Sequence, residues 1–163
     1  MKLFDFPCVA VSTTIEAPLA AVWSVVDDIN APASFSQEFD GADWTDEGPH
    51  GVGSTFVGRN HRGDNSWTTT STVTAWIPDN LFTFVVGEVN EPLAIWSFSL
   101  HREGDRTRLT FVATLGRGES GVSRAVSANP DREEEIVAGR LALWQSNMTA
   151  TLEGIKSLAE SIN

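Results

Sequence analysis

The stretch GSTFVGRNHRGDNSWTTTSTVTAWIPDNLFTFVV, residues 53–86, decides the fold class of this chain. Within it, apolar and polar side chains alternate with a period of two, which is typical of β-strands with one buried face. Two breaks with turn chemistry interrupt the alternation, GDN at 63–65 and PDN at 78–80. Because links this short can join only antiparallel neighbours, the stretch predicts three consecutive strands of an antiparallel meander.

The same pattern continues on both sides of this stretch. CVAVSTTIE at 8–16 predicts a first strand, and FDGADWT at 39–45 predicts a second. IWSFSLHRE at 95–103 and RTRLTFVATL at 106–115 predict two final strands joined by a short hairpin connection. Together these segments predict a curved antiparallel sheet of seven strands, and the short links disfavour a Rossmann-type parallel sheet.

Apolar side chains at three- and four-residue spacing predict the helices. A short helix follows Pro18 and ends before Pro32, and 33–37 has room for one more turn. The sequence NPD at 129–131 supplies a cap and a first-turn proline for a long C-terminal helix. The apolar stripe of that helix comprises Val137, Leu141, Trp144, Met148, Leu152, Ile155, Ala159 and Ile162. Residues 116–128, rich in Gly and Ser without periodicity, predict a mobile loop that could act as a lid.

Composition fits one globular α+β domain over residues 1–163, with 41% apolar and 20% charged residues. The formal net charge of −11 argues against attraction to nucleic acid or to an anionic lipid surface. Neither an export signal nor an apolar run long enough to span a membrane is evident. The single cysteine, Cys8, excludes an internal disulfide, and its neighbours favour a small core side chain. We therefore expect a cytoplasmic protein.

A strongly bent sheet that grips one helix leaves an apolar gap, which is the default position of a ligand site. Strand parity and the helix stripe predict the lining of this gap. The predicted ligand-binding residues are Phe56, Asn60, Trp67, Thr69, Ser71, Phe82, Phe84, Trp96, Phe98, Phe111, Trp144 and Met148. On the strand that contains Trp67, the inward face is expected to continue through Val73 and Ala75. The aromatic members also suit an ordinary core, whereas the polar members favour a pocket, because an unpartnered buried polar group costs about 1–3 kcal/mol.

Three residues are candidates for catalysis. Glu88 shares the inward parity of Phe84, and a carboxyl among aromatic rings would have a raised pKa suited to general acid–base work. The alternative is that Glu88, at a strand end, reaches water. Asn60 could hold a substrate carbonyl, and Arg140, one position from the helix stripe, could orient a carbonyl or a carboxylate.

Other chemistries lack a motif in this sequence. His50, His61 and His101 are scattered, and neither CxxC nor HExxH occurs, so we expect no metal site. No GxSxG elbow, Walker motif or dinucleotide-binding glycine pattern is present either. We therefore expect no cofactor.

Three segments resemble the polyketide cyclase/dehydrase branch of the SRPBCC, or START-like, superfamily in their order and spacing. They are IEAPLAAVWSVVDD at 15–28, the stretch at 53–86, and NMTATLEGIKSLAE at 147–160. The resemblance covers nearly the whole chain. It implies a helix-grip fold with two short helices after the first strand. It also implies a cavity between sheet and long helix, used in relatives for lipids, sterols, plant hormones, quinones or polyketide intermediates.

The resemblance leaves three functions open. The first is binding or carriage of a small hydrophobic, lipid-like or aromatic molecule. The second is an aromatase/cyclase activity that closes and dehydrates a polyketide. The third is a protein-interaction role similar to that of the Hsp90-activator branch, in which the acidic surface would matter more than the cavity. A homodimer is also compatible with the sequence.

Overall fold

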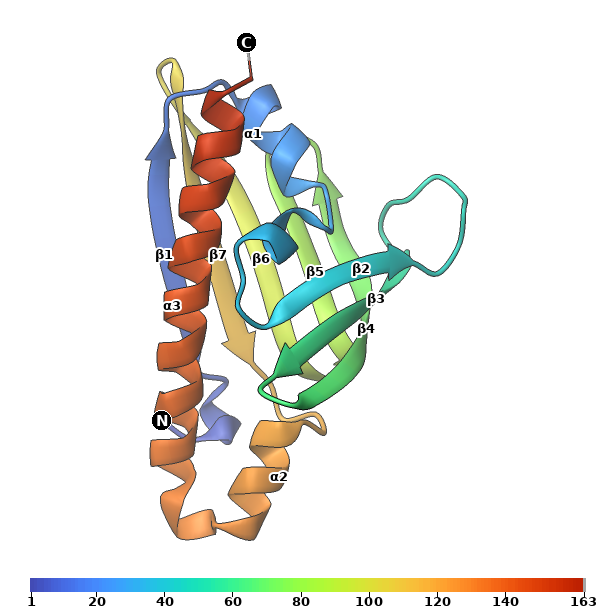
Figure 1. Cartoon of the computed structure of the whole chain (residues 1–163), viewed down its shortest axis with the longest axis vertical. Coiled ribbons are helices and arrows are strands. Elements are labelled where there is room, and N and C mark those ends of the chain that lie inside the picture. Colours follow the sequence, from blue (N-terminus) through green and yellow to red (C-terminus); the bar gives the residue numbers. More distant parts are fainter. Residues whose placement is uncertain (163) are drawn as a thin grey trace.

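The computed structural model describes residues 1–162 and contains one sheet whose strands all pair antiparallel (Figure 1). The strands lie in the order β1-β7-β6-β5-β4-β3-β2, so the first strand pairs with the last and each later pair is a sequence neighbour. Their bounds are β1 Cys8–Ile15, β2 Phe39–Trp44, β3 Thr55–Arg62, β4 Asn65–Ile77, β5 Leu81–Glu88, β6 Glu91–Glu103 and β7 Arg106–Leu115. The antiparallel sheet of seven strands predicted from the alternation is therefore confirmed.

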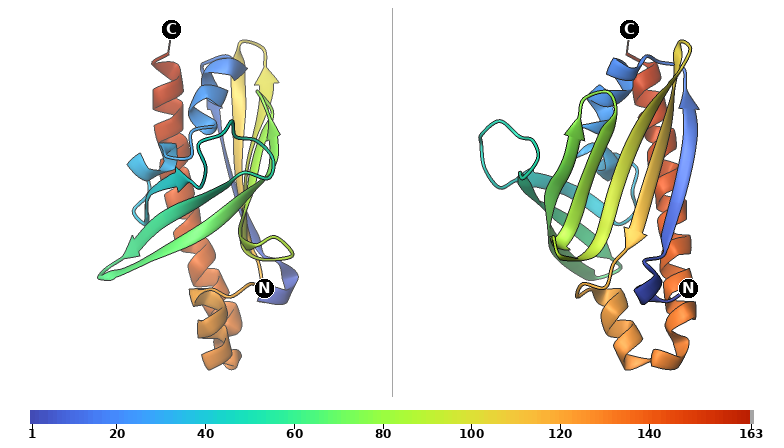
Figure 2. Two further views of the ribbon diagram at one scale, coloured as in Figure 1. Left: turned by 90° about the vertical axis from the view of Figure 1, so that its right-hand side faces the viewer. Right: turned by 180° about the vertical axis from the view of Figure 1, so that it is seen from behind.

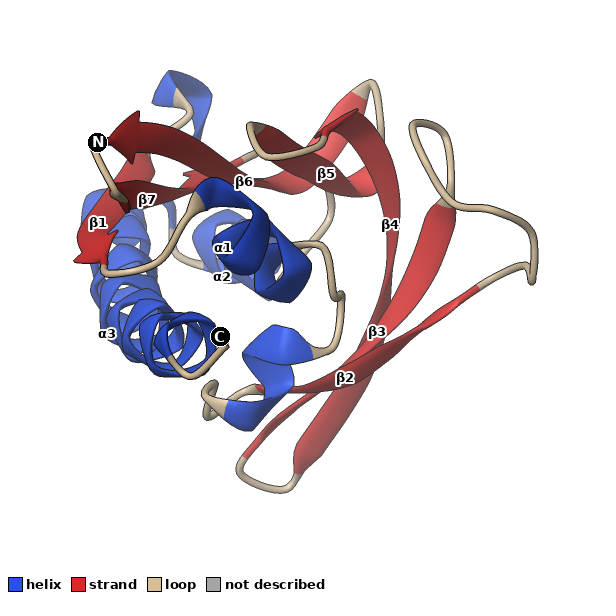
Figure 3. Ribbon diagram, turned by 90° about the horizontal axis from the view of Figure 1, so that it is seen from above, coloured by secondary structure: helices blue, strands red, loops and turns tan. Residues whose placement is uncertain are grey.

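The α-helices lie on the concave side of the sheet, as the view from above shows (Figure 3). The α-helices are α1 Leu19–Val26, α2 Gly121–Ala128 and α3 Glu133–Glu160. Single turns of 3-10 helix occur at η1 Leu3–Asp5, η2 Ala31–Ser34 and η3 Pro130–Arg132. The long C-terminal helix and the short helices after β1 agree with the sequence prediction.

The prediction of an irregular loop over 116–128 is wrong for its second half, which forms α2. Two serines cap this helix reciprocally: Ser123 N–H donates to Ser120 Oγ at 3.1 Å, and Ser120 N–H donates to Ser123 Oγ at 2.7 Å. This arrangement is a capping box built with Ser in place of the usual Glu or Gln. Local capping therefore starts a helix that hydrophobic periodicity did not reveal.

The sheet bends because its ladder is interrupted on three strands. Register shifts occur between Phe39 and Gly41, between Val73 and Ala75, and between Val86 and Gly87. Figure 2 shows the consequence: the β3–β4 hairpin swings away from the plane of the strands that lie against α3. The bulges thus divide one continuous sheet into a half beneath the helices and a half that stands away from them.

The core extends from the strands beneath the helices into β4 and β5, where Val73 and Phe82 are buried. α3 lies mainly against β1 and α1, and Ile15, Leu109 and Ile155 are completely buried there. Lys156 Nζ donates a 2.6 Å hydrogen bond to the Thr14 carbonyl, which fixes α3 along the edge strand. Cys8, expected in the core, is instead exposed, because it begins the edge strand β1 on its outward-facing parity.

The η2 segment closes one side of the molecule. The Asn30 side chain donates to the Ala42 carbonyl at 3.0 Å and accepts from the Ala42 N–H at 2.8 Å, which joins the segment to β2. On the other side, Phe35 lies so close to α3 that a Cβ on Gly154 would be 2.3 Å from its ring. The chain between α1 and β2 therefore bridges α3 and the far edge of the sheet.

Candidate functional site

A cavity of about 680 Å³ lies between the concave face of β3–β7 and the helices α2 and α3. α1 and the η2 segment line its upper side through residues such as Val26 and Pro32. The β3–β4 hairpin and α2 line its lower side, where Arg62 and Arg124 are exposed. The volume lies in the range of small-molecule sites, about 300–1,000 Å³.

Aromatic rings form the walls of the cavity. On the side of α3, Trp96 and Trp144 have ring centroids 4.8 Å apart, and Phe111 lies 5.5 Å from Trp96. On the side of the hairpin, Phe56 meets Phe84 edge-to-face at 5.2 Å. Such pairs hold one another in fixed orientations, so the walls are preformed.

Polar side chains interrupt these walls. Asn60, Thr69 and Ser71 lie in the lining, and Ser71 is only 2% exposed. Within residues 1–162 their side chains make no hydrogen bond that meets normal geometry, yet none of their polar atoms is sealed away from accessible space. Because these residues line the cavity, water or a ligand there can satisfy their polar atoms.

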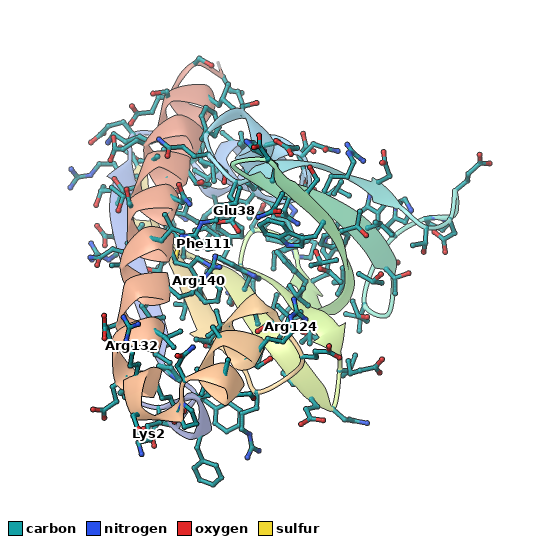
Figure 4. The ribbon with its side chains drawn as sticks, turned by 60° about the horizontal axis from the view of Figure 1, so that its bottom comes forward. Lys2, Glu38, Phe111, Arg124, Arg132 and Arg140 are labelled. Atoms are coloured by element: carbon teal, nitrogen blue, oxygen red, sulfur yellow. The ribbon has the colours of Figure 1, made fainter. Side chains whose placement is uncertain are left out.

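A partly buried ion pair stands at the edge of the cavity, in addition to the exposed pair Arg124–Glu119 at the lower rim. Arg140 of α3 donates through Nη1 to both oxygens of Glu38, at 3.3 and 3.4 Å. The two side chains are 17% and 16% exposed, and both residues line the cavity. Figure 4 shows Arg140 and Glu38 near Phe111, at the interior side of the long helix. The pair connects α3 with the segment that leads into β2.

The lower rim depends on two glycines in the connection from β7 to α2. Gly116 N–H donates to the Leu93 carbonyl and Gly118 N–H donates to the Pro92 carbonyl, each at 2.9 Å. A Cβ on Gly116 would lie 2.0 Å from the Pro92 oxygen, so only glycine allows this approach. The connection is therefore anchored to the start of β6, and it holds Val122 of α2 against the cavity.

The structure places every predicted ligand-binding residue in the lining of this cavity. Their role in binding stays a prediction. Of the three catalytic candidates, Asn60 and Arg140 also line the cavity, and they come from opposite sides, β3 and α3.

The inward placement of Glu88 is wrong. Glu88 is exposed, and it is absent from the lining within the described residues. The register shift here leaves Leu93 of β6 unpaired, and on β5 itself Gly87 has a φ of +85°, outside the extended range, directly before Glu88. The parity that correctly orients Phe84 and Val86 therefore does not extend to the end of β5.

A second bulge changes the inward face of β4. The register shift after Val73 moves Ala75 opposite Thr83 and brings Trp76 opposite Phe82. Trp76 then packs edge-to-face on Phe82 at 5.2 Å. The expected inward position of Ala75 is wrong, and Trp76 takes its place beside the core.

Sequence reasoning missed several lining residues. Asn147 and Thr151 share the stripe of Trp144 and Met148 and could have been found from helical spacing, although their polar character hid them. Glu38 carries no local signal, because it lies in an irregular segment and meets Arg140 from 102 residues away.

The described residues 1–162 contain neither a metal site nor a membrane-spanning helix. There, no group of three or more His, Cys, Asp or Glu side chains is placed to hold a metal ion. In the same range, no helix combines the length and the apolar character needed to cross a membrane.

A curved antiparallel sheet closed by a long C-terminal helix, with an apolar cavity between them, defines a helix-grip protein. Residues 7–160 match the family described as polyketide cyclase/dehydrase and lipid transport. The chain belongs to this family. No curated protein sequence gives a significant match.

Solved structures agree with this assignment. A polyketide cyclase-like protein from Corynebacterium glutamicum is 26% identical, with a TM-score of 0.68 over 94% of this chain and 91% of the other. The ZhuI aromatase/cyclase from Streptomyces sp. R1128 is 20% identical, with a TM-score of 0.68 over 94% and 93% of the two chains. The major latex-like protein 151 of Panax ginseng is 12% identical, with a TM-score of 0.60 over 93% and 95%. The last two likenesses show the fold alone.

Proposed function

We propose that this chain binds one small hydrophobic molecule, aromatic or lipid-like, in the cavity between β3–β7 and α3. The observation that carries the proposal is the combination of fixed aromatic walls with polar residues that line the cavity without a protein partner. In a solidly packed core, each polar side-chain atom without a hydrogen-bond partner would cost about 1–3 kcal/mol, so polar residues at these positions favour a cavity over a core. The family description, which includes lipid transport, is consistent with this role. The single cysteine suits a cytoplasmic location, which we include in the proposal.

A second candidate is cyclisation and dehydration of a polyketide. The family description names these reactions, and Asn60 and Arg140 could hold two carbonyls of one chain from opposite walls. Because Glu88 lies outside the cavity, any proton transfer would need a different carboxyl, and Glu38 is the half-buried one in the lining. The protein-interaction alternative gains no support from the cavity.

The binding proposal is tested by filling the cavity from one strand. Ser71→Leu places an apolar side chain inside the cavity, whereas Thr70→Leu adds the same side chain on the exposed outer face of β4. The fluorescence of N-phenyl-1-naphthylamine, which rises in apolar surroundings, reports occupancy. We expect Ser71→Leu to weaken binding at least about tenfold, or about 1.4 kcal/mol, and Thr70→Leu to leave it unchanged.

An equal response of the two variants, or no binding to the wild-type protein, would count against the proposed site. Native mass spectrometry of freshly purified protein, followed by extraction, would identify a retained natural ligand. To separate carrier from cyclase, Asn60→Ala would then be assayed for turnover of that molecule, and unchanged turnover would exclude a catalytic role for Asn60.

A further inference from the structure

Arg140 leaves most of its hydrogen-bonding capacity unused. A guanidinium has five N–H donors, and here only Nη1 donates, to both oxygens of Glu38. The distances of 3.3 and 3.4 Å are long compared with about 2.7–2.9 Å for a strong charge-assisted bond. Within residues 1–162, Nε and Nη2 of Arg140 have no partner, and neither atom is sealed from accessible space. The pair is therefore a weak contact that leaves one edge of the guanidinium available.

The position of Arg140 gives this free edge a function. Its side chain is 17% exposed, in contrast to the exposed Arg62 and Arg124 at the lower rim. In Figure 4, Arg140 lies beside Phe111, between the aromatic interior and the rim that carries Arg124. A charged group at such a boundary interacts more strongly than one in open water, because the effective dielectric constant is lower. A ligand whose body fills the aromatic space would bring its polar end to this guanidinium.

The carboxylate of Glu38 would compete with a ligand oxyanion for this guanidinium. Glu38 already occupies the place where a ligand oxyanion would bind, so a neutral ligand has little to gain from displacing it. A ligand carboxylate, sulfonate or enolate can replace Glu38 with a bidentate contact, which the present one-nitrogen geometry does not provide. Removing the carboxylate would also remove its repulsion of an incoming anion.

We propose that Arg140 is the specificity-determining residue of the cavity and selects ligands that carry an acidic or oxyanionic group, with Glu38 as its internal competitor. This inference rests on the proposed binding function and adds the chemical class of the ligand. The other charged lining residues are exposed and do not contact Arg140, and one of them, Arg124, pairs with Glu119 at 3.4 Å; they are Asp28, Arg62, Glu119 and Arg124. The selectivity is therefore assigned to the Arg140–Glu38 pair.

Two fluorescent molecules provide a matched test. N-phenyl-1-naphthylamine is neutral, and 8-anilinonaphthalene-1-sulfonate carries the same ring skeleton with one sulfonate. Their dissociation constants would be measured for the wild-type protein, Arg140→Met, Glu38→Gln and the control Arg108→Met. Arg140→Met retains an unbranched apolar stem without the charge. Arg108 is exposed on β7, on the parity opposite Phe111, and lies outside the lining of the described residues.

We expect Arg140→Met to weaken sulfonate binding about tenfold and to leave binding of the neutral molecule within about twofold. Glu38→Gln is expected to tighten sulfonate binding several-fold, and Arg108→Met to change neither constant. If Glu38 only stabilised the structure, Glu38→Gln would weaken the binding of both fluorescent molecules equally. That result would overturn the role of Glu38 as a competitor. An unchanged sulfonate-to-neutral ratio in Arg140→Met would overturn the proposal while leaving the binding function intact. Failure of both molecules to bind the wild-type protein would instead reject the binding function itself.

Discussion

The two halves of the sheet follow the same alternating pattern but serve different purposes. Where β1 and β7 lie against α1 and α3, inward side chains such as Leu109 are completely buried, although Phe111 further along β7 lines the cavity. In the half formed by β3, β4 and β5, inward side chains such as Phe84 face the cavity, because α3 does not reach them. An inward aromatic residue is therefore core or cavity wall according to what lies opposite it, and its own strand cannot decide which.

Truncation in each half provides the strongest test of this comparison. Leu109→Ala truncates a completely buried side chain and should lower the unfolding free energy by about 3 kcal/mol. The cost is high because the truncation leaves an empty cavity that water cannot enter. Phe84→Ala should cost about half as much, although the removed side chain is larger, because one of its faces already borders the cavity. Urea denaturation monitored by circular dichroism measures both. A loss for Phe84→Ala that equals or exceeds that for Leu109→Ala would mean that the two halves are packed alike.

The η2 segment joins the halves, and its contact with α3 can be tested at one glycine. Gly154→Ala gains up to about 1 kcal/mol in helix propensity but must displace the Phe35 ring, which overpacking data place at about 1–3 kcal/mol. We expect a net loss of about 1 kcal/mol. Gly139→Ala on the same helix meets no atom within 4 Å and should be stabilised by about 0.5–1 kcal/mol.

The stability changes expected for these two variants have opposite signs, which distinguishes the specific contact with Phe35 from a general effect of alanine on helix propensity. Phe35→Leu in the Gly154→Ala background should recover part of the loss, because the shorter side chain makes room for the new methyl group. Thermal unfolding of the wild-type protein, Gly154→Ala, Phe35→Leu and the double variant measures the coupling. Stabilisation by both glycine replacements would show that Phe35 does not rest on α3 in solution.

The smallest effects concern two carboxylates whose pKa values move in opposite directions. Burial at the end of α1, and then the neighbouring charge of Asp28, raise the pKa of Asp27 above its ordinary value of 3.8. The folded state therefore holds this proton more tightly, and the contribution of Asp27 to stability falls as pH rises through the interval just above 3.8. At Glu160, the hydrogen bond from the Glu16 N–H lowers the pKa below 4.5, so its contribution is present at neutral pH and is lost on acidification.

Asp27→Asn should accordingly be more stable than the wild-type protein at neutral pH, and the difference should vanish in acid once Asp27 is protonated. Glu160→Gln should be less stable than the wild-type protein at neutral pH, and this difference in stability should disappear as the pH falls. Midpoints of urea unfolding from about pH 3 to pH 7 measure both slopes. A shared sign for the two differences would contradict the assigned directions of the pKa shifts.

Most of the candidate site could be predicted because the alternation is local. Parity assigned Phe56, Phe98 and Phe111 to the concave face without knowledge of any partner strand. Parity failed on β4, where a bulge at Thr74 moved Ala75, and at the end of β5, where Gly87 with its positive φ precedes Glu88. A one-residue insertion in a ladder reverses all positions beyond it, and the composition of these strands does not reveal where the insertion falls.

The sequence by itself determined the antiparallel sheet, the long C-terminal helix and the identity of the inward aromatic residues, since each depends on spacing or turn chemistry between near neighbours. Only the tertiary structure decided which of those residues enclose a cavity and that Glu38 meets Arg140. Both outcomes depend on how far the helix reaches across a bent sheet and on a contact between segments 102 residues apart. The reach of the helix and a contact between such remote segments are both set by the packing of the whole domain rather than by any local sequence pattern.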